Sequence, residues 1–146
     1  MEIREIVEKD LVGLLELYTQ LHDNTLPEIT QEIKQLWKQI LTDKNHHIIC
    51  GIVDNKIVCS CVLIIIPNLT HHQRPYALIE NVITHKDYRN KGFATAILNY
   101  AGTLAKKDNC YKIMLMTGSK LDSTLKFYEN AGYNRIDKTA FIKWLE

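Results

Sequence analysis

The segment Arg89–Thr95, RNKGFAT, combines residue types that bind a small anion. It stands between an apolar run and a helix-like pattern, where the first amides of a helix have no internal partner and carry the positive end of the helix dipole. Gly92 has no side chain to keep a ligand from the backbone, and Ala94 is small. Arg89 and Lys91 add positive charge. The alternative is an ordinary helix start that needs Gly92 only for the turn.

Glu80 is the second chemical candidate, because it interrupts the apolar sequence ALIENVI. A strand that is covered on both faces is expected to be apolar, and a buried carboxylate is unfavourable without a partner or a cleft. Glu80 is therefore a candidate general base that takes a proton from a substrate. A salt-bridged glutamate, or one at the rim of the sheet, is the alternative interpretation.

These candidates must be positioned by alternating strands and helices. The spacing of apolar residues predicts the order β-α-α-β-β-β-α-β-α-β, an α/β fold (α+β mixed sheet) with helices on both faces. Asp54 and Asn55 indicate a tight turn and hence an antiparallel hairpin, and Asp10 is a plausible cap for the first helix. The expected strands cover 1–7, 46–53, 56–66, 76–84, 111–117 and 140–145, and the expected helices cover 11–21, 26–41, 92–107 and 121–131.

Composition limits the classes of function. The chain has 146 residues, which fits one domain over 1–146, and 46% of them are hydrophobic, enough for a core. The formal net charge of +1 argues against nucleic acid as a partner. The acidic start is unlike a signal peptide and no apolar run is long enough for a membrane span, so we expect a cytoplasmic protein without membrane contact.

Cysteines and histidines do not predict a metal site. Cys59 and Cys61 form a C-x-C within an apolar run, but no second pair with zinc spacing exists among the four cysteines. The histidine pairs His46-His47 and His71-His72 are adjacent, and adjacent strand residues point to opposite faces. We therefore expect reduced, core-filling thiols and no metal.

Two motifs resemble the GNAT superfamily of acetyl-CoA-dependent N-acetyltransferases. Its acyl-CoA-binding motif is written Arg/Gln-x-x-Gly-x-Gly/Ala, and Arg89, Gly92 and Ala94 match it. Further along, KFYENAGY from Lys126 to Tyr133 is similar to the superfamily's second motif, an aromatic-Tyr-Glu on a helix followed by Gly-aromatic. The resemblance is close in the second half of the chain and rests on element order in the first half. It implies a GNAT-like acyl-CoA N-acyltransferase fold.

The resemblance also implies the cofactor and the residues that hold it. The pyrophosphate of acetyl-CoA is expected on the backbone amides from Asn90 to Thr95, so it would be the anion that the segment binds. The pantetheine arm is expected to pair with strand backbone from Val82 to Thr84. The implied cofactor-binding residues are Val82, Ile83, Thr84, Arg89, Asn90, Lys91, Gly92, Phe93, Ala94 and Thr95.

Tyr128 is the catalytic acid that the resemblance implies, because the family places a tyrosine of this motif close to the thioester sulfur. The reference pKa of a tyrosine, about 10, lies near the thiol value of about 8.5, so a phenol can protonate a departing thiolate. A packed aromatic on an amphipathic helix is the alternative, although Phe127 is the more natural core residue. A backbone amide near Val82 or Ile83 is a candidate oxyanion donor.

A weaker similarity connects IENV, CYKIML and FYENAGY with the glucosamine-6-phosphate N-acetyltransferase branch. The chain departs from that branch at Asn81, where an acid is usual, and in MTGSKLDSTL, which lacks the asparagine that many members have before the tyrosine helix. We therefore expect a primary amine of a small molecule as the acceptor, without specifying which one.

Other classes of function stay open at this point. One alternative is a non-catalytic acyl-CoA-binding or sensing module, and another is a structural α/β domain that binds nothing. The apolar tail TAFIKWL allows a homodimer through the last strand, but an edge strand packed within the chain explains it equally well.

Overall fold

The computed structural model describes residues 1–21 and 25–145, so residues 22–24 and 146 of the predicted domain lie outside the described residues. The chain divides into two compact units, Met1–Met114 and Leu115–Glu146, and each is considered by itself. None of the helices in the described part is long and apolar enough to cross a membrane.

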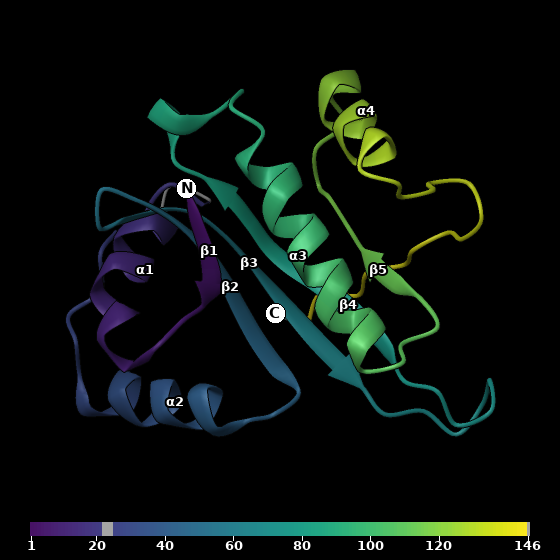
Figure 1. The fold of residues 1–146 in the computed structure, drawn as a ribbon, viewed down its shortest axis with the longest axis horizontal. Coiled ribbons are helices and arrows are strands. Elements are labelled where there is room, and N and C mark those ends of the chain that lie inside the picture. Colours follow the sequence, from purple (N-terminus) through teal and green to yellow (C-terminus); the bar gives the residue numbers. More distant parts are fainter. Residues whose placement is uncertain (22–24, 146) are drawn as a thin grey trace. The chain divides into compact units, whose positions relative to one another are not determined.

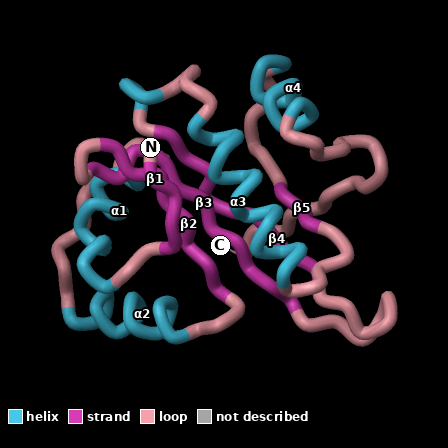
Figure 2. Tube along the Cα trace, viewed as in Figure 1, coloured by secondary structure: helices cyan, strands magenta, loops and turns pink. Residues whose placement is uncertain are grey.

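The first unit is built on a mixed sheet with the strand order β1-β2-β3-β4-β5 (Figures 1 and 2). Strands β1 to β4 pair antiparallel with their neighbours. Asp54 and Asn55 have φ of 49° and 62°, so the predicted tight turn between β2 and β3 is confirmed. The strands are β1 (Glu2–Glu5), β2 (His46–Val53), β3 (Lys56–Ile66), β4 (Tyr76–Thr84) and β5 (Ile113–Leu115).

Four α-helices and two short 3-10 helices complete the described elements. α1 packs against β3 and β4, whereas α3 packs against β2, β3 and β4. The helices are α1 (Leu11–Tyr18), α2 (Gln31–Thr42), α3 (Phe93–Lys107) and α4 (Asp122–Asn130), with η1 (Glu8–Asp10) and η2 (Lys86–Tyr88). The order therefore follows the prediction up to α4.

The sheet has two differently packed faces. Cys50 and Val62 belong to one apolar cluster with Leu14 and Leu17 of α1 and Trp37 of α2. Because side chains alternate along a strand, the intervening residues face the opposite side, where α3 packs. The α3 side is formed by fully or almost fully buried apolar residues: Ile49, Cys61, Leu63 and Ile79 of the sheet, with Ile97, Leu98, Ala101 and Ala105 of α3.

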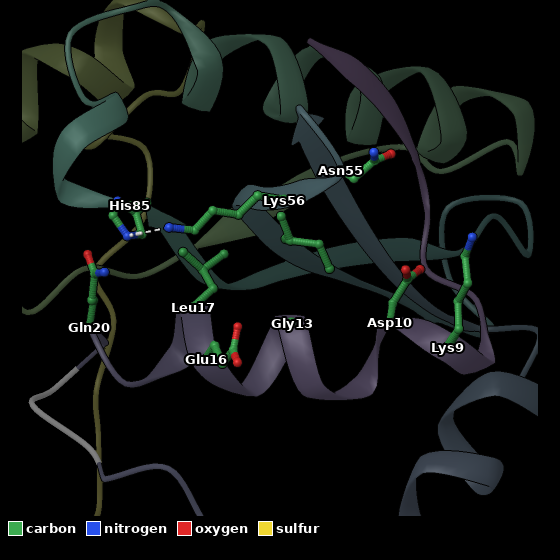
Figure 3. Close-up of a pocket in the computed structure, with 10 residues that line it drawn as sticks. Lys9, Asp10, Gly13, Glu16, Leu17, Gln20, Asn55, Lys56 and His85 are labelled. Carbon is green, nitrogen blue, oxygen red and sulfur yellow. Dashed lines mark hydrogen bonds between the residues drawn. The ribbon is translucent and has the colours of Figure 1, made fainter.

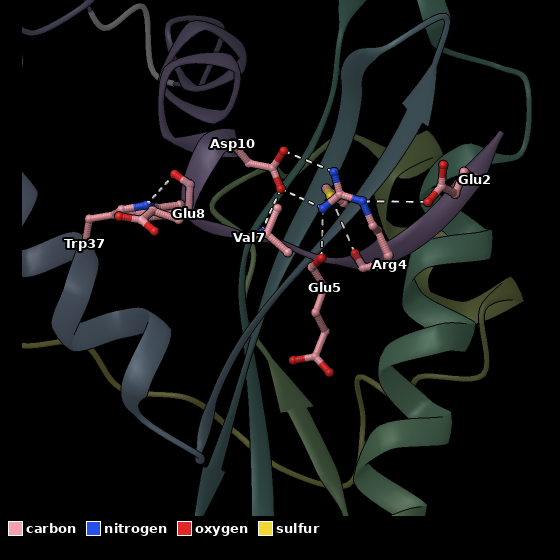
Figure 4. A network of polar contacts seen from close by, with 8 residues as sticks. Glu2, Arg4, Glu5, Val7, Glu8, Asp10 and Trp37 are labelled. Atoms are coloured by element: carbon pink, nitrogen blue, oxygen red, sulfur yellow. Dashed lines mark hydrogen bonds and ion pairs between the residues drawn. The ribbon is translucent and has the colours of Figure 1, made fainter.

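Asp10 does not cap α1 with its side chain. Its carboxylate accepts hydrogen bonds from Arg4 Nη1 at 2.6 Å, from Arg4 Nη2 at 3.0 Å and from the Val7 amide at 2.7 Å (Figure 4). The Arg4 guanidinium therefore holds the pKa of this buried carboxyl below its usual range, against the effect of burial. Asp10, which was predicted to cap the first helix, instead links β1 to η1. The nearby Trp37 Nε1 donates to the Glu8 carbonyl at 3.0 Å and attaches α2 to the same corner.

The expected last strand at 140–145 is the main difference from the prediction, because these residues form neither helix nor strand. Alternation of apolar residues shows which side chains favour burial, but a strand also needs a neighbour that accepts and donates its backbone hydrogen bonds. In the second unit the side chains of Phe141, Trp144 and Leu145 are exposed. The strand expected at 111–117 is also shorter, being confined to β5.

Candidate active site

Strand β4 contains a bulge at the position of the predicted base. Ser60 of β3 lies opposite Ile83, and Val62 lies opposite Glu80, so β4 has one residue more than β3 in this interval. Asn81 within the bulge has φ of 50°, in the left-handed region that asparagine adopts more readily than most residues. Such a bulge interrupts strand pairing and re-aims side chains, and bulges are frequent next to active sites.

Glu80 lies on the α1 side of the sheet, since its partner Val62 belongs to the cluster of that side. The residue is half-buried. No ion pair or hydrogen bond joins its side chain to any residue in the described part of the chain, so the alternative of a salt-bridged glutamate is not what the structure shows. The carboxylate is thus available to a ligand on the α1 side of the bulge.

The predicted anion site forms a turn that opens directly into α3. Gly92 is the residue before the helix and has φ of 75°, a conformation in which a side chain would be strained. A Cβ atom at this position would find no neighbour within 4 Å, and no side chain caps the first turn. The amides of Phe93, Ala94 and Thr95 are therefore oriented as helix N-terminal donors without a side-chain acceptor.

Two cations border this turn and are fixed by backbone oxygens. Arg89 Nε donates to the Thr84 carbonyl at 3.3 Å, and Lys91 Nζ donates to the Asp87 carbonyl at 3.2 Å. Lys91 also lies over the Tyr88 ring, 4.9 Å from its centre. Arg89, Asn90 and Lys91 are exposed, so the positive charges of Arg89 and Lys91 lie at the surface beside the helix N-terminus.

His85 connects the end of β4 with this turn. Its Nδ1 accepts a hydrogen bond from the Asp87 amide at 3.3 Å, its Nε2 lies 3.2 Å from Lys56 Nζ, and its ring contacts Tyr88 edge-on. Burial, followed by the nearby Lys56 ammonium, lowers the pKa of His85, so the imidazole is neutral at neutral pH. Sequence reasoning had left this histidine without a role.

The remaining predicted cofactor residues occupy the end of β4. Ile83 is buried, whereas Val82 and Thr84 are half-buried. The Thr84 hydroxyl oxygen is buried without a hydrogen bond to a described residue. An uncapped helix N-terminus, a glycine with open space beside it and a polar strand end together fit a phosphorylated ligand with an extended, hydrogen-bonding arm.

Tyr128, the predicted acid, belongs to the second unit. It lies on α4 in a group of aromatic rings, with its ring centre 4.9 Å from that of Phe127 and 6.3 Å from that of Tyr133. The residue is half-buried, and the Tyr133 amide donates to its carbonyl at 3.0 Å. The helix that was expected for the second motif is therefore present.

A surface cavity of about 320 Å³ lies between α1, the β2–β3 turn and His85 (Figure 3). Figure 3 shows Glu16 of α1, and Gln20 just after the end of α1, on one wall and Lys56 on the other. The Gln20 side chain accepts a hydrogen bond from the Lys86 amide at 2.9 Å, which ties the turn after α1 to η2. None of the predicted site residues lines this cavity.

The cysteines are placed as core thiols. Burial raises the pKa of Cys59 to about 11 and that of Cys61 to about 12, so both stay protonated and unreactive at neutral pH. All four cysteines are free. Among the described residues no group of three His, Cys, Asp or Glu side chains could hold a metal ion.

Three polar residues at the bulge were missed as a group. Tyr18 of α1 and Ser60 of β3 place buried hydroxyls on the side of the sheet where Asn81 interrupts β4. The pair Glu80-Asn81 in an otherwise apolar strand was a visible signal, because asparagine is disfavoured in strands. The strand register and the helix packing decide which hydroxyls surround this pair, and a single sequence specifies neither.

The fold, the acyl-CoA-binding motif around Gly92 and the second motif from Lys126 to Tyr133 together define an acetyltransferase. The sequence model of the acetyltransferase (GNAT) family matches residues 11–133. The chain therefore belongs to the GNAT family of N-acetyltransferases, whose members use acetyl-CoA.

Individual proteins are similar to this chain over almost its whole length. The glucosamine 6-phosphate N-acetyltransferase of Trypanosoma brucei brucei is 27% identical over 136 residues, which are 91% of this chain and 88% of that protein. A solved structure from Agrobacterium tumefaciens str. C58, provisionally described as an acetyltransferase, has a TM-score of 0.90 and 35% identity, covering 99% of this chain and 100% of the other. A structure described as a transcriptional regulator from Bacillus halodurans C-125 has a TM-score of 0.86 and 25% identity, covering 98% and 99%.

Proposed function

We propose that this protein transfers an acetyl group from acetyl-CoA to a primary amine of a small molecule, by direct transfer while both substrates are bound. The observation that carries the proposal is the uncapped N-terminus of α3 behind Gly92, in the same unit as a β4 bulge that presents Glu80. The family model spans both compact units, which supports one transferase domain.

The turn and the end of β4 would hold the cofactor. Backbone amides from Asn90 to Thr95 would bind the pyrophosphate, with Arg89 and Lys91 adding positive charge at its rim. The backbone of Val82, Ile83 and Thr84 would pair with the pantetheine arm, and the unpartnered Thr84 hydroxyl supports this assignment. When bound, acetyl-CoA supplies the activated acetyl group as a thioester.

Three groups of the chain would assist the transfer. Glu80 would take the proton that the acceptor ammonium must lose, so that the amine lone pair forms the new C–N bond. A backbone amide of the bulge would donate to the carbonyl oxygen as negative charge develops there. Tyr128 would give its proton to the sulfur as the C–S bond breaks. No covalent enzyme intermediate is needed when both substrates are held together.

Calorimetry with acetyl-CoA and with desulfo-CoA tests the cofactor assignment. We expect micromolar binding by the wild type and loss of binding in Gly92→Glu, because a carboxylate at the turn repels the pyrophosphate and fills its place. An amine panel that begins with glucosamine 6-phosphate, the substrate named for the trypanosomal relative, then tests the reaction through formation of the N-acetyl product.

The outcomes separate the candidate functions. Turnover of an amine that is strongly reduced in the Tyr128→Phe, Glu80→Gln double variant supports the catalytic assignment. Binding of acetyl-CoA without turnover of any amine would instead support a non-catalytic binding or sensing module. Wild-type protein that binds neither cofactor form would overturn the proposed function.

A further inference from the structure

Three polar side chains from three different elements meet at the β4 bulge. Tyr18 is the last residue of α1, Ser60 lies on β3 opposite Ile83, and Asn81 is within the bulge itself. α1 packs against both strands on this side of the sheet. The three residues come together only in the folded chain, around the backbone that the proposed function places beside the acetyl group.

The two hydroxyls of this group are buried without protein partners. Tyr18 Oη and Ser60 Oγ form no hydrogen bond with any described residue, and Ser60 is completely buried. Burial raises the pKa of Tyr18 to about 12, while the Ser60 hydroxyl and the Asn81 side chain lie close enough to oppose part of that rise. The phenol is therefore a neutral donor at neutral pH, with Ser60 and Asn81 as its polar neighbours.

Packing does not explain these hydroxyls. Apart from Ser60 and Asn81, the cluster that Tyr18 packs against is apolar, including Leu14, Leu17 and Ile83, and Ser60 lies opposite Ile83. Phenylalanine and alanine would therefore fill the same space without burying polar atoms. Buried polar groups are nearly always hydrogen-bonded to protein or to ordered water. A water molecule between two hydroxyls and an amide would have the two to four polar partners that internal waters have.

The backbone conformation of the bulge also has to be stabilised by contacts with other residues. Asn81 keeps φ of 50°, which a non-glycine residue adopts at some strain. If the extra residue moved into regular pairing, the side chains beyond it would exchange faces and the bulge amides would turn towards β3. Asn81 is an exposed residue, so few protein contacts are available to fix it.

We propose that Tyr18 is a positioning residue for acetyl transfer: together with Ser60 and one bridging water it holds Asn81, and thereby fixes the β4 bulge whose amides face the acetyl carbonyl. The inference rests on the proposed function. It assigns to α1 a role in arranging the reacting carbonyl, in addition to packing on the sheet.

The test compares the affinities of acetyl-CoA and CoA, so it needs no knowledge of the acceptor. We expect the wild type to bind acetyl-CoA about fivefold more tightly than CoA, the effect of roughly one additional hydrogen bond to the carbonyl. Tyr18→Phe should reduce this ratio to about one while leaving the CoA affinity unchanged. Tyr100→Phe, which removes a hydroxyl from α3, is the matched control and should keep the wild-type ratio.

Two further measurements separate a positioning role of Tyr18 from a general loss of structure in the Tyr18→Phe variant. The carbonyl stretch of ¹³C-acetyl-CoA in difference infrared spectra should be lowered on the wild type and should return towards the free value on Tyr18→Phe. Asn81→Gly keeps the left-handed backbone but removes the side chain, so the double variant with Tyr18→Phe should be no worse than either single variant. Ser60→Ala provides the same test if Tyr18→Phe fails to fold.

The outcomes distinguish this inference from the proposed function. A wild type that binds neither acetyl-CoA nor CoA overturns the proposed function and this inference with it. A wild type that prefers acetyl-CoA, with Tyr18→Phe and Ser60→Ala retaining both that preference and the wild-type carbonyl frequency, overturns only the positioning role.

Discussion

The two faces of β3 and β4 are built from the same strands but differ in chemistry. On the α3 side, Leu63 and Ile79 pair across the strands and are at most 1% exposed, with only apolar neighbours from the sheet and the helix named above. On the α1 side, the same strands present Ser60 and Glu80 within an otherwise apolar cluster. Polar groups are concentrated where β4 bulges, which indicates that one face mainly stabilises the fold and the other also serves the site.

The largest effect on stability is expected on the α3 side of the sheet. Leu63→Ala should lower the free energy of unfolding by about 3–4 kcal/mol, because it removes buried methyl groups and leaves a cavity beneath α3. Urea denaturation followed by circular dichroism measures the change. Leu69→Ala is the matched control, since Leu69 is 87% exposed and should change stability by no more than about 0.5 kcal/mol. Equal effects for the two variants would contradict the division between the faces.

The Arg4–Asp10 pair tests the polar corner that attaches α1 to the sheet. Asp10→Ala should destabilise by about 2–3 kcal/mol at pH 7, because it leaves the Arg4 guanidinium and the Val7 amide without their acceptor. Glu2→Gln, a change at the exposed partner of Arg4, should have a far smaller effect. If the two variants were equally stable, the carboxylate of Asp10 would not be the anchor of this corner.

The pH dependence of this pair has a definite sign. The folded-state pKa of Asp10 is lowered, so its contribution is fully present above the unfolded-state value of about 3.9 and is lost as the pH falls through the folded-state value. The difference in stability between wild type and Asp10→Ala should therefore be constant near neutrality and shrink only in acid. A difference that shrinks between pH 8 and pH 6 would contradict this assignment.

Much of this fold was predictable, because its elements carry local signals. The tight turn at Asp54 and Asn55, the full extent of β4 and the start of α3 behind Gly92 follow from turn chemistry and apolar spacing. The strand expected at 140–145 is absent because pairing depends on a neighbour, which alternation does not provide. The same limit applies to the site: Gly92 was visible as a motif, whereas the bulge and its hydroxyls depend on register.

Gly92 and Gly102 allow the effect of alanine on stability to be compared between a turn that a ligand would use and the interior of a helix. Gly92→Ala should destabilise by about 1 kcal/mol, because alanine at φ of 75° is strained although its Cβ meets no neighbour. Gly102→Ala should stabilise by about 0.5–1 kcal/mol, because alanine is favoured inside a helix and the space beside Gly102 is open. Thermal unfolding of both variants measures the contrast. Stabilisation by Gly92→Ala would mean that the turn relaxes to an ordinary helix start.

Ser60→Ala should give the smallest change in stability and best separates the roles of the two faces. The hydroxyl is completely buried without a described protein partner, so its removal should shift the free energy of unfolding by less than about 1 kcal/mol in either direction. Its effect should appear instead in the preference for acetyl-CoA over CoA. Val58→Ala, a truncation at another fully buried β3 position, should show the reverse, with lower stability and an unchanged preference. A large loss of stability in Ser60→Ala would mean that the hydroxyl serves the fold, and the polar groups of the α1 face would then need no functional explanation.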